Sequence, residues 1–159
     1  MILQLTPNTH PILHERVKPC SKDLDRPEMS RILKENMIHY EGVGLSANQI
    51  GINERVFVMI LDIDTQETIT CFNPKILKYS KDMVVMEEGC LSYPDMYLDV
   101  PRPESVVVKY EDEGKKVHKL KLEGLAARVF QHEYDHMEGI DFSQRANVAI
   151  NTSKELTLN

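Results

Sequence analysis

An early stretch of the chain carries apolar residues at helical spacing. Between Asp25 and the next glycines they occupy one face of a helix, at Met29, Ile32, Leu33, Met37 and Tyr40. The Asp25 side chain can accept hydrogen bonds from free N–H groups at a helix start, and Pro27 suits the first turn. We therefore predict a helix that begins after Asp25. It should end before Gly42 and Gly44, which favour a loop leading into a short extended segment.

The middle of the chain changes to short runs rich in Val, Ile, Thr and aromatic residues, separated by polar turns. Such runs are typical of strands. We predict strands in RVFVMIL, TITCFNP and MVVMEEGCLSY, which cover residues 55–61, 68–74 and 83–93. Residues 105–122 alternate apolar and polar positions on both sides of Glu113-Gly114, so this segment is predicted to form a hairpin.

A second helix is predicted from Gly124 to Glu138, with Gly139 at a position typical of a helix C-terminus. Five of its residues share one face, which should point toward the core: Leu125, Val129, His132, Glu133 and His136. Strands grouped between two helices favour an α+β fold, with antiparallel sheets packed around this second helix and an N-terminal helix beside them. We expect residues 1–159 to form one catalytic domain.

Composition and charge describe an ordinary globular chain. Of its 159 residues, 42% are hydrophobic and 28% charged, which argues against disorder or a fibrous repeat. The formal net charge of −6, with no cluster of Lys and Arg, argues against sequence-specific nucleic-acid binding. The N-terminal sequence MILQLTPNTHPILHERV has neither a charged leader nor a membrane span, so we expect a cytoplasmic protein.

The second helix contains the sequence HEYDH, in which His132 and His136 lie one turn apart and Glu133 follows the first. Imidazoles at this spacing can bind one divalent metal, and a glutamate in this position can take a proton from water that the metal activates. The pattern therefore predicts a hydrolytic metal site. A buried, hydrogen-bonded histidine pair would give the same spacing by chance, so a third ligand is needed to decide.

Two residues can supply that third ligand. One protease class has a further histidine six residues after His136, but Phe142 stands there, which excludes the class. Glu155 lies at a separation that another class of metallo-endopeptidase accepts, although it belongs to a polar tail. Cys90 follows an apolar strand run and a glycine, and two histidines with one cysteine form an attested catalytic ligand set. Taken alone, Cys90 is more often a buried core thiol.

The other two cysteines, Cys20 and Cys71, have no adjacent glycine to admit a metal or a substrate, and we expect both to be inert. Three widely spaced cysteines are a poor disulfide framework, which agrees with a reducing compartment.

Three segments resemble, in this order, the signature motifs of the peptide deformylase family: GVGLSANQ (Gly42–Gln49), EGCLS (Glu88–Ser92) and QHEYDH (Gln131–His136). The first has Ser46 where the family usually has alanine, a small-for-small change that we expect to leave the site unaltered. The flanking sequences NPKIL and VPRPE also resemble the family, so the resemblance covers roughly residues 1–145.

The resemblance implies removal of the N-formyl group from the N-terminal methionine of nascent polypeptides, with release of formate, during co-translational N-terminal processing. It implies Glu133 as the general acid/base, and Gln49 and the backbone N–H of Leu91 as the donors that hold the substrate carbonyl oxygen. It also implies three metal ligands, Cys90, His132 and His136.

Further residues are implied along the path of the substrate. The resemblance places Val43, Gly44, Gly89 and Arg102 there, and glycines beside a reactive segment let a peptide backbone approach and pair as an added strand. An arginine between two prolines, as Arg102 is, could equally be a solvated surface residue.

The pocket for the methionine side chain should use the helix face one turn before His132. Leu125 and Val129 suit an unbranched thioether chain. Arg128 places a charge beside that apolar pocket. We predict that its aliphatic stem lines the pocket rim while its guanidinium reaches solvent or an acid.

The expected cofactor is one divalent metal ion, Fe²⁺ in the cell by resemblance to the family. The general affinity order favours zinc over Fe²⁺ at a Cys/His/His site, so a purified sample can carry zinc, nickel or cobalt instead.

Many bacterial members of the family continue into a long basic C-terminal helix that docks on the ribosome. This chain ends with SQRANVAINTSKELTLN, so we expect no direct ribosome binding, and the short form suits a virus of bacteria or another reduced genome. We expect a monomer whose partners are N-formylmethionyl nascent peptides. Two alternatives remain: a metallo-endopeptidase that uses Glu155, and an inactive relative that keeps the peptide groove.

Overall fold

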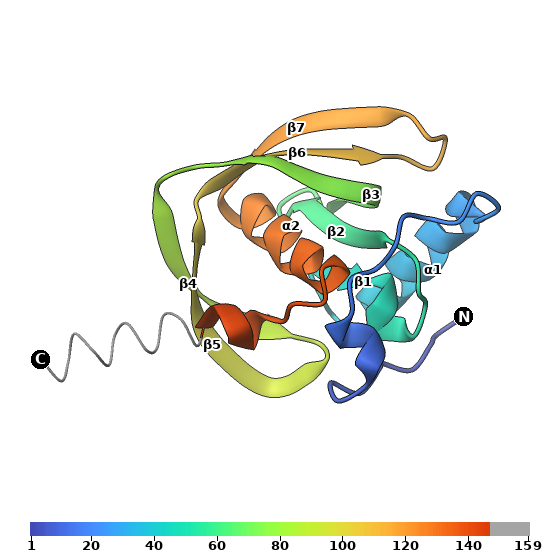
Figure 1. The fold of residues 1–159 in the computed structure, drawn as a ribbon, viewed down its shortest axis with the longest axis horizontal. Helices are drawn as coiled ribbons and strands as arrows, with labels where there is room; N and C mark the ends of the chain where they lie inside the picture. Colours follow the sequence, from blue (N-terminus) through green and yellow to red (C-terminus); the bar gives the residue numbers. More distant parts are fainter. Residues whose placement is uncertain (147–159) are drawn as a thin grey trace, which may run out of the picture.

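The computed structural model describes residues 1–146. Figure 1 shows helix α2 in the centre of the fold, the β4–β5 hairpin on one side of it and α1 on the other. In chain order the elements are η1 (Pro11–His14), α1 (Arg26–His39), β1 (Gly44–Ser46), η2 (Ala47–Ile50), β2 (Val56–Asp62), β3 (Glu67–Tyr79), β4 (Met83–Cys90), β5 (Tyr93–Pro103), β6 (Ser105–Glu111), β7 (Val117–Glu123) and α2 (Gly124–Met137), where η marks a 3₁₀ helix.

The strands form two antiparallel sheets. Five of them make one sheet in the order β1-β2-β3-β6-β7, while β4 and β5 form a separate two-stranded sheet. The predicted α+β class, with antiparallel sheets around the second helix, is therefore confirmed. The two predicted helices and the predicted 105–122 hairpin are also present.

Strand β2 explains why a sheet can lie between two helices. Side chains alternate across a strand, and here both faces are buried. Val56 and Val58 belong to the core cluster that contains Leu33 of α1. Phe57 and Met59 belong to the other cluster, which lies beneath α2. The central helix is thus held by the sheet face opposite to the one that α1 covers.

Strand β5 is the element that the sequence pattern does not predict. It contains three prolines and two acidic residues, which indicate a loop because proline cannot donate to a strand ladder. Within residues 1–146 its only strand partner is β4, so both strands are sheet edges, where proline is tolerated. Most of β4 is exposed, but Glu88 on β4 and Arg102 on β5 are buried, and both bond to side chains of α2.

Side chains cap the start of α1 and the end of α2. The Asp25 carboxylate accepts the Glu28 N–H at 3.1 Å, as its sequence position predicts. At the end of α2 the Asn48 side chain donates to the His136 carbonyl at 2.8 Å, and Arg55 donates to the Met137 carbonyl at 3.1 Å. These bonds satisfy carbonyl groups that a helix end leaves free and hold this end of α2 in place.

Within residues 1–146, no helix is both long enough and apolar enough to cross a membrane.

Candidate active site

The inward face of α2 carries three buried polar side chains. His132, Glu133 and His136 are 9%, 3% and 1% exposed, although such groups are seldom buried without partners. Val129 is buried on the same face, while Leu125, in the first turn, is 41% exposed and lies at the rim of the site. The helical face inferred from the sequence is therefore buried from Val129 onward.

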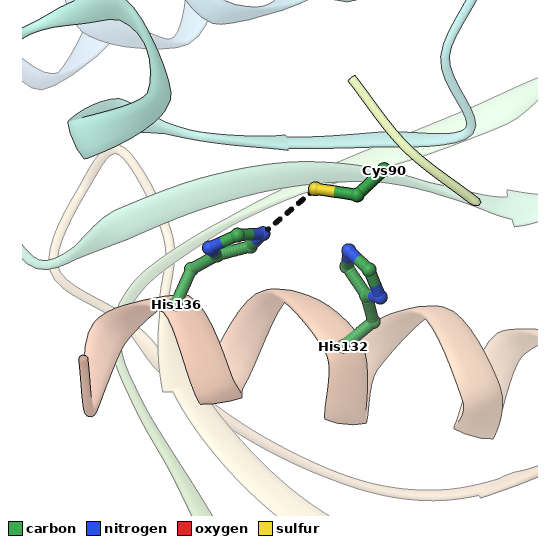
Figure 2. Close-up of side chains that lie close together, drawn as sticks. All are labelled: Cys90, His132 and His136. Carbon is green, nitrogen blue, oxygen red and sulfur yellow. Dashed lines mark hydrogen bonds between the residues drawn. The ribbon is translucent and has the colours of Figure 1, made fainter. Parts of the chain in front are cut away.

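Cys90 meets the two histidines of α2 (Figure 2). Its sulfur points toward the His136 ring, and the His132 ring lies below the Cys90 side chain in this view. One ligand atom from each of Cys90, His132 and His136 can be chosen so that all three lie within 4.8 Å of one another. The Cys90 Sγ lies 3.4 Å from His136 Nε2. Glu155 and the rest of the C-terminal tail after residue 146 lie outside the described residues.

A change of register in the β4–β5 hairpin turns Cys90 toward the helix. Gly89 pairs with Tyr97, but the next residue, Cys90, pairs with Tyr93. Such an irregularity bends a strand and redirects the side chain beside it. A Cβ on Gly89 would lie 2.8 Å from Tyr97 Cε1, so a larger residue here would have to displace the exposed ring of Tyr97, whereas the sequence argument invoked the approach of substrate.

A buried carboxylate, Glu88, orients the first histidine. Its Oε1 lies 2.9 Å from His132 Nδ1. A carboxylate can only accept, so Nδ1 carries the proton and Nε2 keeps a lone pair for a metal. Glu88 was not among the predicted site residues. The sequence does contain a signal for it. Glu88 lies two residues before Cys90, and side chains two residues apart in a strand point to the same face.

Arg102 holds the same carboxylate from the other side. It donates to Glu88 twice, at 2.6 and 3.0 Å, and to Asp135 at 2.9 Å. Burial alone would raise the pKa of Glu88, but hydrogen bonds from His132 and Arg102 hold it well below its usual range. Arg102 is 3% exposed, so it is not a solvated residue. It lies behind Glu88 and is not among the residues that line the main cavity.

The side chain of Arg128 also binds Glu88. Its guanidinium donates to Glu88 Oε2 at 2.7 Å and to the carbonyl groups of Val100 and Val84, each at 2.7 Å. The prediction allowed solvent or an acid as its partner, and the structure gives an acid, with the whole side chain only 6% exposed. Arg128 therefore ties α2 to both strands of the β4–β5 hairpin while it lines the cavity.

Glu133 lies beside the candidate metal ligands without a full set of partners. Within residues 1–146 its Oε1 is a buried oxygen with no hydrogen-bond donor. Burial raises the pKa of Glu133 to about 7, although the nearby His132 lowers it. A Cβ on Gly44 would lie 2.8 Å from Glu133 Oε2 and 2.9 Å from Val129 Cγ1. Glycine at position 44 therefore lets β1 pass close to the catalytic face of α2.

A cavity of about 550 Å³ opens next to these side chains. Its walls come from β1, the β4–β5 hairpin and α2. Most of the residues inferred for substrate binding line it, together with the candidate catalytic groups: Val43, Gly44, Gln49, Gly89, Cys90, Leu91, Leu125, Arg128, Val129, His132 and Glu133. Of the inferred substrate residues, Arg102 is the one placed elsewhere.

Gln49 reaches the site from η2, where the sequence argument expected an extended segment. It is 1% exposed. Its Nε2 donates to Ser92 Oγ at 3.1 Å and toward Cys90 Sγ at 3.6 Å. A hydrogen-bond donor therefore lies beside the cluster of ligands.

The donor set fits a transition metal. One thiol and two imidazoles suit zinc, iron(II), nickel or cobalt better than magnesium or calcium, which prefer oxygen ligands. The bond from His132 to Glu88 is the outer contact that metal-binding histidines usually make. His136 Nδ1 has no such partner within residues 1–146.

A buried HExxH helix with a cysteine from a neighbouring hairpin defines a metal-dependent hydrolase. Comparisons with known proteins make the class specific. The family profile described as polypeptide deformylase matches residues 2–151. This chain belongs to that family, whose members are hydrolases that remove N-formyl groups.

Individual relatives agree with the family assignment. The chain is 40% identical to a peptide deformylase of Thermotoga sp. (strain RQ2), over 87% of this chain and 84% of the relative. The crystal structure of peptide deformylase from Thermotoga maritima superposes with a TM-score of 0.86 at 37% identity, covering 91% of this chain and 97% of the other. A Met-Ala-Ser-bound class I type b peptide deformylase from Acinetobacter baumannii gives 0.83 at 30% identity, covering 91% and 98%.

The raised pKa of Glu133 predicts a pH dependence of stability in the metal-free protein. A carboxyl group that is easier to protonate when folded stabilises the fold at low pH, and this contribution is lost as pH rises from the unfolded value through about 7. Between pH 5 and pH 8 the free energy of unfolding should fall by roughly 2 kcal/mol more in the wild type than in Glu133→Gln. Urea unfolding at both pH values measures this difference, and parallel pH profiles for the two proteins would contradict it.

Proposed function

We propose that Cys90, His132 and His136 bind one divalent metal, Fe²⁺ in the cell, and that this site removes the formyl group from N-formylmethionyl nascent peptides. The products are formate and a free N-terminal amine. The observation that carries this proposal is the approach of a thiol from the β4–β5 hairpin to two imidazoles of α2, with Glu133 between them in sequence.

Glu133 is the proposed general acid/base. When bound, the cation supplies Lewis acidity, which makes water more acidic and polarises the formyl carbonyl. A carboxyl group whose pKa lies at about 7 is suited to exchange a proton at neutral pH. Glu133 takes the proton of the attacking water and returns it to the departing amine.

Two donors are proposed to stabilise the negative charge that develops on the formyl oxygen. Gln49 Nε2 lies beside Cys90, and Leu91 follows Cys90 in the chain and lines the cavity. Donors held in place before the reaction stabilise this charge without the cost of reorganising water.

The substrate is proposed to lie as an added strand between β1 and the β4–β5 hairpin. Val43 and Gly44 line the cavity from one side and Gly89 from the other. The methionine side chain would contact Leu125, Val129 and the stem of Arg128, while Arg102 would act only through Glu88. A relative bound to Met-Ala-Ser, the product expected from formyl-Met-Ala-Ser, supports this choice of substrate.

We also propose that the protein is a single catalytic domain that works as a monomer in the cytoplasm. A single chain supplies all three proposed ligands and the whole cavity wall, which supports a site that is complete in one copy.

The proposed site predicts that the protein loaded anaerobically with iron releases formate from formyl-Met-Ala-Ser. Treatment with a chelator should abolish this activity, and Fe²⁺ should restore it. Cys90→Ser should lower both the metal content and kcat/KM by at least about 100-fold, because a hydroxyl is a much poorer metal ligand than a thiolate. Metal analysis and a formate assay measure both effects.

Two control variants separate the alternatives. Cys20→Ser changes a half-buried thiol that donates to the Arg55 carbonyl, far along the chain from the site, and should keep metal and activity. Glu155→Ala should also keep both. Loss of metal from Glu155→Ala but not from Cys90→Ser, or cleavage of an internal peptide bond without release of formate, would contradict the proposal.

Arg128 is predicted to shape substrate preference. Arg128→Ile removes the guanidinium from the cavity wall and its three bonds to the hairpin. We expect the ratio of kcat/KM for formyl-Met and formyl-Phe peptides to change by about fivefold or more, since a small change in a pocket wall is worth roughly 1–3 kcal/mol. Arg16→Ile, at an exposed arginine that also pairs with a glutamate, is the matched control. An unchanged ratio in Arg128→Ile would exclude Arg128 from the pocket.

A further inference from the structure

Ser46 differs from an alanine at this position by one hydroxyl, which has partners that alanine would lack. The side chain is fully buried, beside the amide of Gln49. The Ser46 Oγ lies 2.6 Å from Asn48 Oδ1 and 3.0 Å from Gln49 Oε1. The change is therefore small in volume but adds a hydroxyl to a buried polar network.

The contacts of Ser46 determine which way the Gln49 amide faces. Gln49 Oε1 accepts both the backbone N–H of Ser46, at 3.0 Å, and its hydroxyl. A backbone N–H can only donate, so the oxygen of the amide must face Ser46. The amide nitrogen then faces Ser92 and Cys90. A flipped amide would place its NH2 group against the buried Ser46 N–H, and that N–H would lose its acceptor.

Asn48 extends this network to the metal-binding helix. Its Oδ1 accepts from Ser46, while its Nδ2 donates at 2.8 Å to the carbonyl of His136. That carbonyl, at the end of α2, also accepts the Gly139 N–H at 3.3 Å. The single hydroxyl proton of Ser46 is shared between Asn48 and Gln49, with the shorter contact to Asn48. A continuous chain of hydrogen bonds thus joins the Gln49 amide to His136, one of the candidate metal ligands.

The backbone of η2 is held separately. The Thr6 N–H donates to the Gln49 carbonyl at 2.7 Å, and the Thr6 hydroxyl donates to the Asn48 carbonyl at 2.9 Å. Loss of the Ser46 hydroxyl therefore leaves these two bonds and the Ser46 N–H bond to Gln49 Oε1 in place, and removes the second bond that Oε1 accepts together with the bond to Asn48.

We propose that Ser46 and Asn48 are positioning residues that hold the Gln49 amide in one orientation, with Nε2 presented to the reacting carbonyl, and couple it to the end of α2. The inference rests on the proposed role of Gln49 as an oxyanion donor. A donor fixed before the substrate arrives contributes more in the transition state than one that must first be oriented.

The test is a double-mutant cycle on the metal-loaded enzyme with formyl-Met-Ala-Ser. Ser46→Ala should lower kcat about tenfold and change KM less than about twofold, because it weakens an interaction made in the transition state. Asn48→Ala should act in the same direction. In a Gln49→Ala background, Ser46→Ala should have no further effect on kcat, since it acts only through that amide. Metal content per chain should stay the same.

Ser30→Ala is the matched control. Ser30 is also buried, and its hydroxyl lies 2.7 Å from Thr70 Oγ1, in the α1 side of the core. Both serine variants should lower the temperature of unfolding to a similar degree, but only Ser46→Ala should lower kcat.

The outcomes distinguish the inference from the proposed function. If Gln49→Ala leaves kcat unchanged, the proposed role of Gln49 is wrong and the inference is overturned with it. If Gln49→Ala lowers kcat but Ser46→Ala does not, only the inference is overturned. An equal drop from Ser46→Ala in the presence and absence of Gln49 would also overturn it, because Ser46 would then act by another route.

Discussion

The buried carboxylate of Glu88 is the constraint on which the site depends. An ionised side chain at this depth is tolerated only with partners, and here His132, Arg102 and Arg128 all contact it. Two of these partners lie on α2 and one on β5, so the carboxylate joins the hairpin to the helix in one register. Cys90 is two residues further along the same strand and is thereby set opposite the histidines. The same contact fixes which nitrogen of His132 faces the site.

The opposite wall of the cavity, formed by the β1–η2 segment, is held by a different kind of interaction. There the β1–η2 segment is held by backbone pairing with β2 and by hydrogen bonds to the N-terminal residues. Gly44 allows that segment to approach Glu133, and Asn48 reaches the end of α2. Helix α2 is therefore held by ionic contacts from the β4–β5 hairpin and by neutral hydrogen bonds from the β1–η2 segment. The cavity opens between these two sets of contacts.

Local patterns were enough to predict the elements that carry the chemistry. The helical spacing of His132 and His136 indicated two candidate ligands, the resemblance to the family implied Cys90 as the third, and the Asp25 cap marked the start of α1. The partners of those groups could not be predicted in this way. Which carboxylate pairs with Arg128 depends on how two segments far apart in the sequence pack together. The spacing of residues along the chain does not predict this packing.

The same reasoning explains the elements that were missed. Strand β5 was not predicted because its prolines indicate a loop, unless the segment is known to lie at the edge of a sheet. The contact between position 89 and the Tyr97 ring across the hairpin depends on strand register, which the sequence argument did not contain.

X-ray absorption spectroscopy of the protein loaded with one zinc or iron ion per chain tests the central claim most directly, since it reads the ligands without any assay. The account predicts one sulfur ligand, at about 2.3 Å for zinc, together with two imidazole nitrogens at about 2.0–2.1 Å. A metal shell with imidazole nitrogens but no sulfur would contradict it, because the β4–β5 hairpin would then have no part in binding the ion.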